Sequence, residues 1–216
     1  MNAQVAPLKP RVESGPCAAE LQRINESLQA RERLLTASAR ASRLLLEAPD
    51  VRAAIPHVLG LIGEAASVDR VNLMQTRIGP NGERLLVVVG EWTAEHGARA
   101  QPSAPQCICD EASYPGVFAE LRAGRSVCFS KGEASAAGQV SAIEGVGTRT
   151  KAIVPIFVAN EFNGVVGFDN TQRQRAIDAS ELAALETAAG VIGAALHRER
   201  LVDDVRRERE RTAEQR

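Results

Sequence analysis

Residues 151–169 read KAIVPIFVANEFNGVVGFD. In the first half, Ile153 and Phe157 alternate with Val154 and Ile156, the period expected of a β-strand with two different faces. Residues 160–164 are mostly polar and end in glycine, which predicts a turn, and residues 165–168 predict the next strand. The segment is therefore expected to form an antiparallel hairpin.

Helices are predicted on both sides of this hairpin. Residues 17–47 lack Pro and Gly and carry a narrow apolar stripe that begins with Leu21, Ile24 and Leu28. Pro49 ends that helix, and Asp50 is a candidate N-cap for a second helix over 51–66. A closing helix, expected to be capped by Ser180, has apolar residues at spacings of three and four: Leu182, Leu185, Ala189, Ile192 and Leu196.

The remaining segments complete an α+β pattern. A hairpin is predicted from strands 69–77 and 84–92, which flank the turn residues 79–82. A long polar loop over 93–113 then leads to a short helix, 115–123, a strand, 126–130, and a short helix with a loop in 131–149. The predicted fold is an antiparallel central sheet with helices on one side, flanked by long N- and C-terminal helices.

Composition excludes several classes of protein. The chain has 216 residues, 26 Lys and Arg against 27 Asp and Glu, and 3% aromatic residues. This balance provides no basic field for nucleic acid or an anionic membrane, and few rings on which bases could stack. No run approaches the roughly 18–20 apolar residues of a membrane helix, and no signal peptide is visible, so a cytoplasmic location is expected.

Three segments carry a family resemblance. Residues 151–156, 164–169 and 181–196 resemble the fifth strand, the sixth strand and the closing helix of a GAF domain, of the kind found in bacterial sensor kinases and related signalling proteins. The likeness extends over about residues 44–198. On this basis the chain divides into a flexible lead-in (1–16), an N-terminal amphipathic helix (17–47), a GAF domain (48–198) and a charged C-terminal helix extension (199–216).

The resemblance implies a sensory module without catalytic activity of its own. A GAF domain holds a small ligand between its sheet and its variable loops, and the flanking helices pass the signal to an output domain such as a histidine kinase or a cyclase, as in two-component systems. The apolar stripes of the flanking helices predict a homodimer through a coiled coil. The identity of the ligand or cofactor is left unknown.

The closing helix changes its phase after Leu196. Glu199 and Asp203 occupy the next expected seam positions, while Leu201, Val202 and Val205 carry the apolar contacts. Such a change alters coiled-coil winding locally, so two helix pairings of similar energy are expected.

Six residues are candidates for the ligand pocket because they are the larger side chains on segments that flank the family's pocket. They are Leu73, Trp92, Phe118, Cys128, Ile143 and Phe157. The alternative interpretation is that most of them are plain core residues.

The cysteines and histidines give weak signals. Cys107 and Cys109 form a C-x-C pair, but a structural zinc site needs about four ligands, so no metal is predicted. His96 is the one candidate for an axial haem ligand. Bilin-binding GAF domains attach the chromophore through a Cys that is usually followed by His, which no cysteine here is, and the cyclic-nucleotide signature is missing because Asn160 precedes Glu161 rather than Lys.

Two alternative functions remain open. Some free-standing GAF-like proteins reduce methionine sulfoxide with pocket cysteines, and Cys107, Cys109 and Cys128 keep that activity possible here. The second alternative is a ligand-free dimerisation module. A thiol-dependent turnover assay distinguishes a reductase from a sensor. Ligand-induced thermal shifts distinguish a sensor from a ligand-free module.

Overall fold

The computed structural model describes residues 16–95, 108–132 and 147–214. His96, Cys107, Ile143 and the predicted short helix after residue 132 lie outside these ranges. The helices are α1 (Pro16–Glu47), α2 (Val51–Ala66), the 3₁₀ turn η1 (Glu111–Ser113), α3 (Pro115–Arg122) and α5 (Ala179–Glu214). The strands are β1 (Arg70–Ile78), β2 (Arg84–Thr93), β3 (Ile108–Asp110), β4 (Val127–Ser130), β5 (Thr150–Val158) and β6 (Glu161–Asn170).

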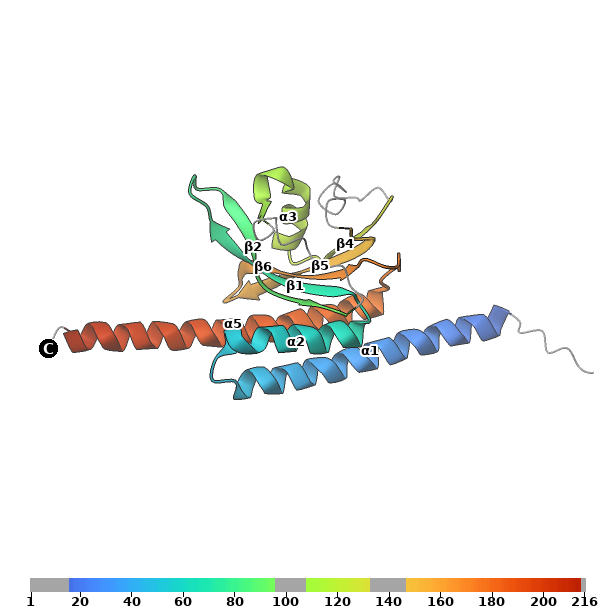
Figure 1. The fold of residues 1–216 in the computed structure, drawn as a ribbon, viewed down its shortest axis with the longest axis horizontal. Helices are drawn as coiled ribbons and strands as arrows, with labels where there is room; N and C mark the ends of the chain where they lie inside the picture. The colour runs from blue at the N-terminus through green and yellow to red at the C-terminus, as the bar shows by residue number, and fades with distance from the viewer. Residues whose placement is uncertain (1–15, 96–107, 133–146, 215–216) are drawn as a thin grey trace, which may run out of the picture.

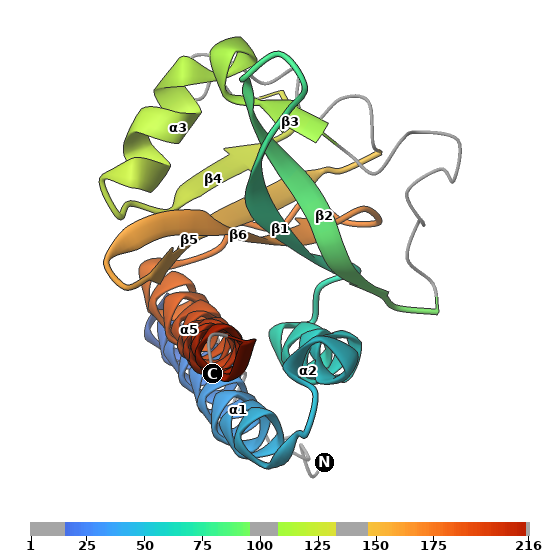
Figure 2. The ribbon, with the colours of Figure 1, turned by 90° about the vertical axis from the view of Figure 1, so that its left-hand side faces the viewer.

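The six strands form one antiparallel sheet in the order β3-β2-β1-β6-β5-β4. Figure 2 shows three layers: α1, α2 and α5 cover one face of the sheet, and the short α3 covers the other. We call these the helical face and the distal face. The predicted α+β class is confirmed, with α3 as the one described α-helix on the distal face.

Helix starts follow local capping chemistry. Asp50 caps α2 as predicted, since its Oδ1 accepts hydrogen bonds from the backbone N–H groups of Arg52 (2.9 Å) and Ala53 (3.2 Å). The cap of α5 is Asp178 and not Ser180 as predicted, because Asp178 Oδ1 accepts from the N–H of Glu181 at 2.8 Å. This carboxylate lies two residues earlier in the chain, and its charge also suits the positive end of the helix dipole.

The β5–β6 hairpin is tighter than the sequence suggested. Only Ala159 and Asn160 form the turn, both with positive φ (51° and 64°), and Val158 pairs directly with Glu161. Residues 161–164, predicted as turn, therefore belong to β6. Gly164 is required there by packing, because a Cβ would lie 2.0 Å from the carbonyl oxygen of Met74 on β1.

Two apolar cores lie on the two faces. The larger one packs α1, α2 and α5 against alternate residues of β1, β5 and β6, with Phe168, Leu59, Ile62, Leu185 and Ile192 among its fully buried side chains. The distal core is smaller and joins the sheet to α3: Met74, Leu86, Val117, Phe118, Leu121, Val127, Phe129 and Val165.

The long helices extend beyond the domain in opposite directions, α1 with its N-terminal half and α5 with its C-terminal half (Figure 1). Both projections carry exposed apolar side chains, among them Leu28 (56% exposed) and Leu201 (54%). Residues 179–213 of α5 satisfy the length and hydropathy of a membrane span, which the sequence analysis had not anticipated. Half of the apolar window is buried inside the domain.

Candidate functional site: a buried polar cluster on the distal face

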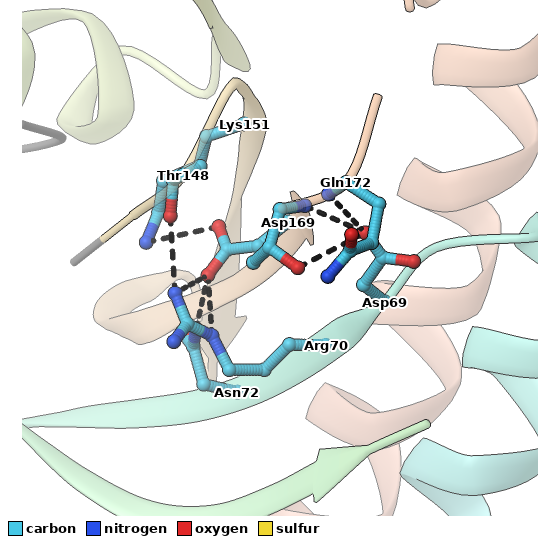
Figure 3. Close-up of polar contacts among 8 residues, drawn as sticks. Asp69, Arg70, Asn72, Thr148, Lys151, Asp169 and Gln172 are labelled. Carbon is cyan, nitrogen blue, oxygen red and sulfur yellow. Dashed lines mark hydrogen bonds and ion pairs between the residues drawn. The ribbon is translucent and has the colours of Figure 1, made fainter. Parts of the chain in front are cut away.

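Five polar side chains meet on the distal face where the central strands lie side by side (Figure 3). We call them the distal polar cluster: Arg70 and Asn72 of β1, Thr148 just before β5, Lys151 of β5 and Asp169 of β6. The register brings them together, since Arg70 is directly opposite Asp169, and Lys151 is opposite Asp169 on the other side. Alternation of side chains turns these residues away from the helical core.

Asp169 is the centre of the cluster. Its Oδ2 accepts hydrogen bonds from Arg70 Nε (2.8 Å) and Nη2 (2.5 Å), and its Oδ1 forms an ion pair with Lys151 Nζ at 3.2 Å. Arg70 Nη2 also donates to Thr148 Oγ1 at 3.1 Å. The side chains of Asp169 and Arg70 are 0% and 3% exposed, so these contacts are shielded from solvent.

Asp169 Oδ1 accepts no hydrogen bond and has only its ion pair with Lys151, and two further polar atoms of the cluster have no partner at all. They are Arg70 Nη1 and Asn72 Oδ1, both without accessible surface. Asn72 lies flat across β6 because position 167 is glycine; a Cβ there would meet Asn72 Oδ1 at 2.5 Å. Leaving a buried donor or acceptor unpaired costs about 1–3 kcal/mol, so these atoms are a reason to expect a further molecule at this place.

Asp69 serves the fold beside this cluster. Its Oδ2 accepts from the backbone N–H groups of Thr171 (2.6 Å) and Gln172 (2.8 Å), as Figure 3 also shows. The carboxylate thereby ties the end of β6 to the start of β1 and fixes the strand register on which the cluster depends.

A second set of contacts joins β5 to the start of α5. Thr150 Oγ1 accepts a hydrogen bond from the N–H of Arg175, and the Arg175 guanidinium holds Glu181 of α5 by two bonds of 2.7 Å. Arg175 Nη2 also donates to the carbonyl oxygen of Ala66 at the end of α2. Since Thr150 is adjacent to Lys151, the cluster and the first turn of α5 are connected through neighbouring residues of one strand.

The predicted pocket residues do not share one face of the sheet. Phe118 and Phe157 lie on the distal side, where both make edge-to-face contacts with Phe162, at centroid distances of 6.4 Å and 6.0 Å. Leu73 instead belongs to the helical core and is 1% exposed. Its position follows from strand parity, because Val71 and Leu73 point one way and Asn72 the other.

Trp92 also lies on the helical side, against α2. A Cβ on Gly63 would come within 2.3 Å of its ring, so the indole occupies the space that this glycine leaves. One edge of Trp92 borders a cleft of about 710 Å³ between the end of α2 and the sheet. This cleft opens on the opposite side of the sheet from the distal polar cluster.

Cys128 points toward α5 rather than toward the distal core formed by its neighbours Val127 and Phe129. Its side chain is exposed at the surface, yet partial desolvation by the surrounding protein, and after it the charges of Glu186 and Glu181, raise the pKa of its thiol. The sixth candidate, Ile143, lies outside the described residues. A shared pocket of all six is therefore not formed by the residues described, and ligand contact by any one of them stays a prediction.

The distal polar cluster was missed because the sequence reading favoured large apolar side chains. A signal was present: Asn72 falls on the strand face opposite Val71, and Asp169 closes the Gly-Phe-Asp motif. In the described ranges no three His, Cys, Asp or Glu side chains gather as a metal site would require.

Comparisons with known proteins agree with this fold. The GAF domain family model matches residues 50–196. The methanogenesis regulatory histidine kinase FilI of Methanothrix harundinacea (strain 6Ac) is 31% identical over 191 residues, which are 86% of this chain and 21% of the kinase. The chain thus spans about a fifth of the length of this curated relative.

Solved structures show the same fold at low identity. The phycocyanobilin-bound GAF domain of a cyanobacterial phytochrome has a TM-score of 0.63 and 15% identity, covering 78% of this chain and 96% of that one. A phycoerythrobilin-bound GAF domain from a cyanobacterial phytochrome has a TM-score of 0.60 and 17% identity, covering 80% and 97%. With the family model matching well over half of its length, the chain belongs to the GAF domain family.

Proposed function

We propose that this GAF domain is a cytoplasmic sensory module that binds a small ligand at the distal polar cluster. Binding is passed through β5 to α5, and α5 transmits it to an output domain or partner. The module itself carries out no chemistry.

The observation that carries this proposal is the pair of unpartnered buried atoms, Arg70 Nη1 and Asn72 Oδ1. Structural ion pairs stabilise a fold best when all their donors and acceptors are used. Here the fixed Arg70–Asp169 pair leaves polar atoms unused on the face that the three long helices leave free. That combination suits a ligand site better than it suits a purely structural pair.

The path to α5 is short. Lys151 contacts Asp169, Thr150 beside it accepts from Arg175, and Arg175 holds Glu181. Further along, Gly193 of α5 lies so close to β5 that a Cβ would come within 3.0 Å of Ile156 Cγ2. A small displacement of β5 would therefore move α5 directly.

We further propose that the module acts as a homodimer through α1 and α5. Leu21, Ile24 and Leu28 are exposed on α1, and Leu46 borders an α1–α5 groove of about 340 Å³ whose α5 wall includes Gly190 and Ala194. A second copy would bury these apolar surfaces. The similarity to part of a histidine kinase supports an output of that kind. A cyclase is the alternative output.

A methionine sulfoxide reductase is the weaker candidate. A reducing cysteine reacts as the thiolate, and the raised pKa of Cys128 disfavours that form. Its position toward α5 also separates it from the distal polar cluster by the sheet.

The proposal is tested with a fusion of residues 1–216 to the catalytic part of a histidine kinase. The protein is purified under mild conditions, its mass is measured natively, and the low-mass fraction released by denaturation is added back to stripped protein. We expect a native mass above the summed mass of the subunits in the assembly and a change in autophosphorylation on addition of the fraction. Asn72→Leu should abolish the response, and Val89→Leu, exposed on β2, should keep it. A native mass equal to the summed mass of the subunits and a fraction without effect would overturn the proposal.

A further inference from the structure

We infer that the ligand of the distal polar cluster is a monovalent organic carboxylate with an apolar body. This inference rests on the proposed function, because it names the class of ligand for the same site.

The first argument is charge. The cluster contains two cations, Arg70 and Lys151, and one carboxylate, Asp169, so it carries one uncompensated positive charge. The three side chains are 3%, 17% and 0% exposed, so water screens this charge poorly. Buried charges are stable when they are paired. One negative charge from a ligand would bring the cluster to neutrality.

Among the described residues, the acidic side chains of the distal layer do not supply that charge. Glu111 is held by Arg122 at 2.7 Å, and Glu120 is held by Arg125 at 2.5 Å. Each of these two carboxylates is neutralised by its own arginine. Asp69, which lies beside the cluster, is held by the backbone N–H groups of Thr171 and Gln172.

The second argument is the geometry of the unused donor. Arg70 donates hydrogen bonds from Nε and Nη2 to Asp169 and Thr148, while Nη1 has no acceptor. A carboxylate oxygen at Nη1 would form a charge-assisted hydrogen bond, the strongest ordinary kind. The same anion would satisfy both the charge and the donor.

The third argument is the apolar surroundings. Met74 follows Asn72 on the same face of β1, and Phe129 is the cross-strand neighbour of Lys151. Val165 pairs with Met74 and belongs to the same distal core. A ligand that reaches Arg70 must therefore place the rest of its body among apolar side chains. A dianion would exceed the single available charge and leave one buried charge unpaired.

The cluster is closed, since Arg70 and Asn72 are 2% and 5% exposed. Binding must displace the cover of the distal face, of which α3 is the described α-helix. We therefore expect slow association that depends little on ionic strength.

The test uses the whole chain with hexanoate as the probe at constant ionic strength in a chloride buffer. Hexanamide serves as the uncharged analogue, and succinate and phosphate serve as dianions. Binding is read from the thermal midpoint and from titration calorimetry. We expect hexanoate to raise the midpoint, hexanamide not to, and the dianions to act more weakly.

Variants locate the effect. Lys151→Met removes the surplus charge and should weaken hexanoate binding at least about tenfold. Asn72→Asp supplies a carboxylate within the cluster and should do the same, which covers the case in which Lys151→Met fails to fold. Lys131→Met, in the exposed turn after β4, makes the same change in net charge and should bind hexanoate as the unaltered chain does.

Equal responses to hexanoate and hexanamide, an equal response to chloride alone, or full hexanoate binding by Lys151→Met would each overturn the inference. A neutral molecule retained by the natively purified protein would also overturn it while leaving the sensory function intact. Failure of the proposed function itself is recognised separately, by the absence of any retained or added molecule that alters the kinase fusion.

Discussion

Thr150 Oγ1 accepts a hydrogen bond of 3.1 Å from the backbone N–H of Arg175. Thr150 is the first residue of β5, and Arg175 lies in the link that leads from β6 to α5. The contact joins a strand that carries one side chain of the distal polar cluster to the residue that fixes Glu181 of α5. It gives the sheet a direct mechanical connection to the helix that leaves the domain.

The charged residues of the cluster should contribute unequally to the free energy of unfolding. Asp169→Asn leaves Arg70 and Lys151 as two buried cations without a carboxylate, and we expect a loss of about 3–5 kcal/mol in the free energy of unfolding. Arg70→Met should cost less, because Lys151 still neutralises Asp169 at 3.2 Å. Urea unfolding of both variants measures the difference. A larger loss for Arg70→Met would show that Lys151 does not neutralise Asp169.

Packing of Trp92 against α2 should tolerate no side chain at position 63. Gly63→Ala places a Cβ about 2.3 Å from the indole ring, so we expect a loss of about 1–3 kcal/mol and a shift in tryptophan emission. The matched control is Gly190→Ala in α5, where a Cβ meets nothing within 4 Å. Higher helix propensity should make that variant equally or more stable, by up to about 1 kcal/mol. Equal stability of the two variants would contradict the packing described here.

Cys128 should be an unreactive thiol. Partial desolvation and nearby carboxylates raise its pKa, so at pH 8 a smaller fraction is thiolate than in the unfolded chain. In a variant whose other three cysteines are serine, alkylation by iodoacetamide at pH 8 should be slower in the native state than in urea. Glu186→Gln removes one of the charges and should accelerate the native reaction. Faster alkylation of the native protein would instead revive the reductase hypothesis.

The apolar side chains on the projecting helices predict a dimer. Light scattering at tens of micromolar should give twice the monomer mass of 23.1 kDa. Leu28→Glu, on the exposed stripe of α1, should raise the dimer dissociation constant at least about tenfold. Val89→Glu changes another exposed apolar residue, 44% exposed on β2, and should leave the dimer intact. A monomer mass for the unaltered chain would refute the dimer.

Much of the fold was predictable because its signals are local. The cap at Asp50, the alternation along β5 and the three-four spacing in α5 each depend on a few neighbouring residues. The N-cap of α5 was misplaced because Ser180 and Asp178 both have suitable side chains, and only the backbone path decides between them.

The candidate site was less accessible to sequence reading. Arg70 and Asp169 are 99 positions apart, and their contact depends on the register between β1 and β6. Strand parity correctly separated Asn72 from Val71, but nothing local told which face of the sheet the long helices would cover. Large apolar residues such as Leu73 and Trp92 were therefore proposed for a pocket. Both pack in the helical core, and their contact with a ligand stays a prediction.

The central claim, that α5 carries the signal out of the domain, is tested most directly by changing the phase of that helix. The chain is fused after Arg216 to a reporter activated by dimerisation, and one to seven residues are inserted at Arg200, just beyond the last buried residue of α5. Because a helix turns by about 100° per residue, we predict that reporter activity rises and falls with insertion length and recovers near seven. Activity that is indifferent to insertion length would mean that α5 is only a tether, and would contradict the account.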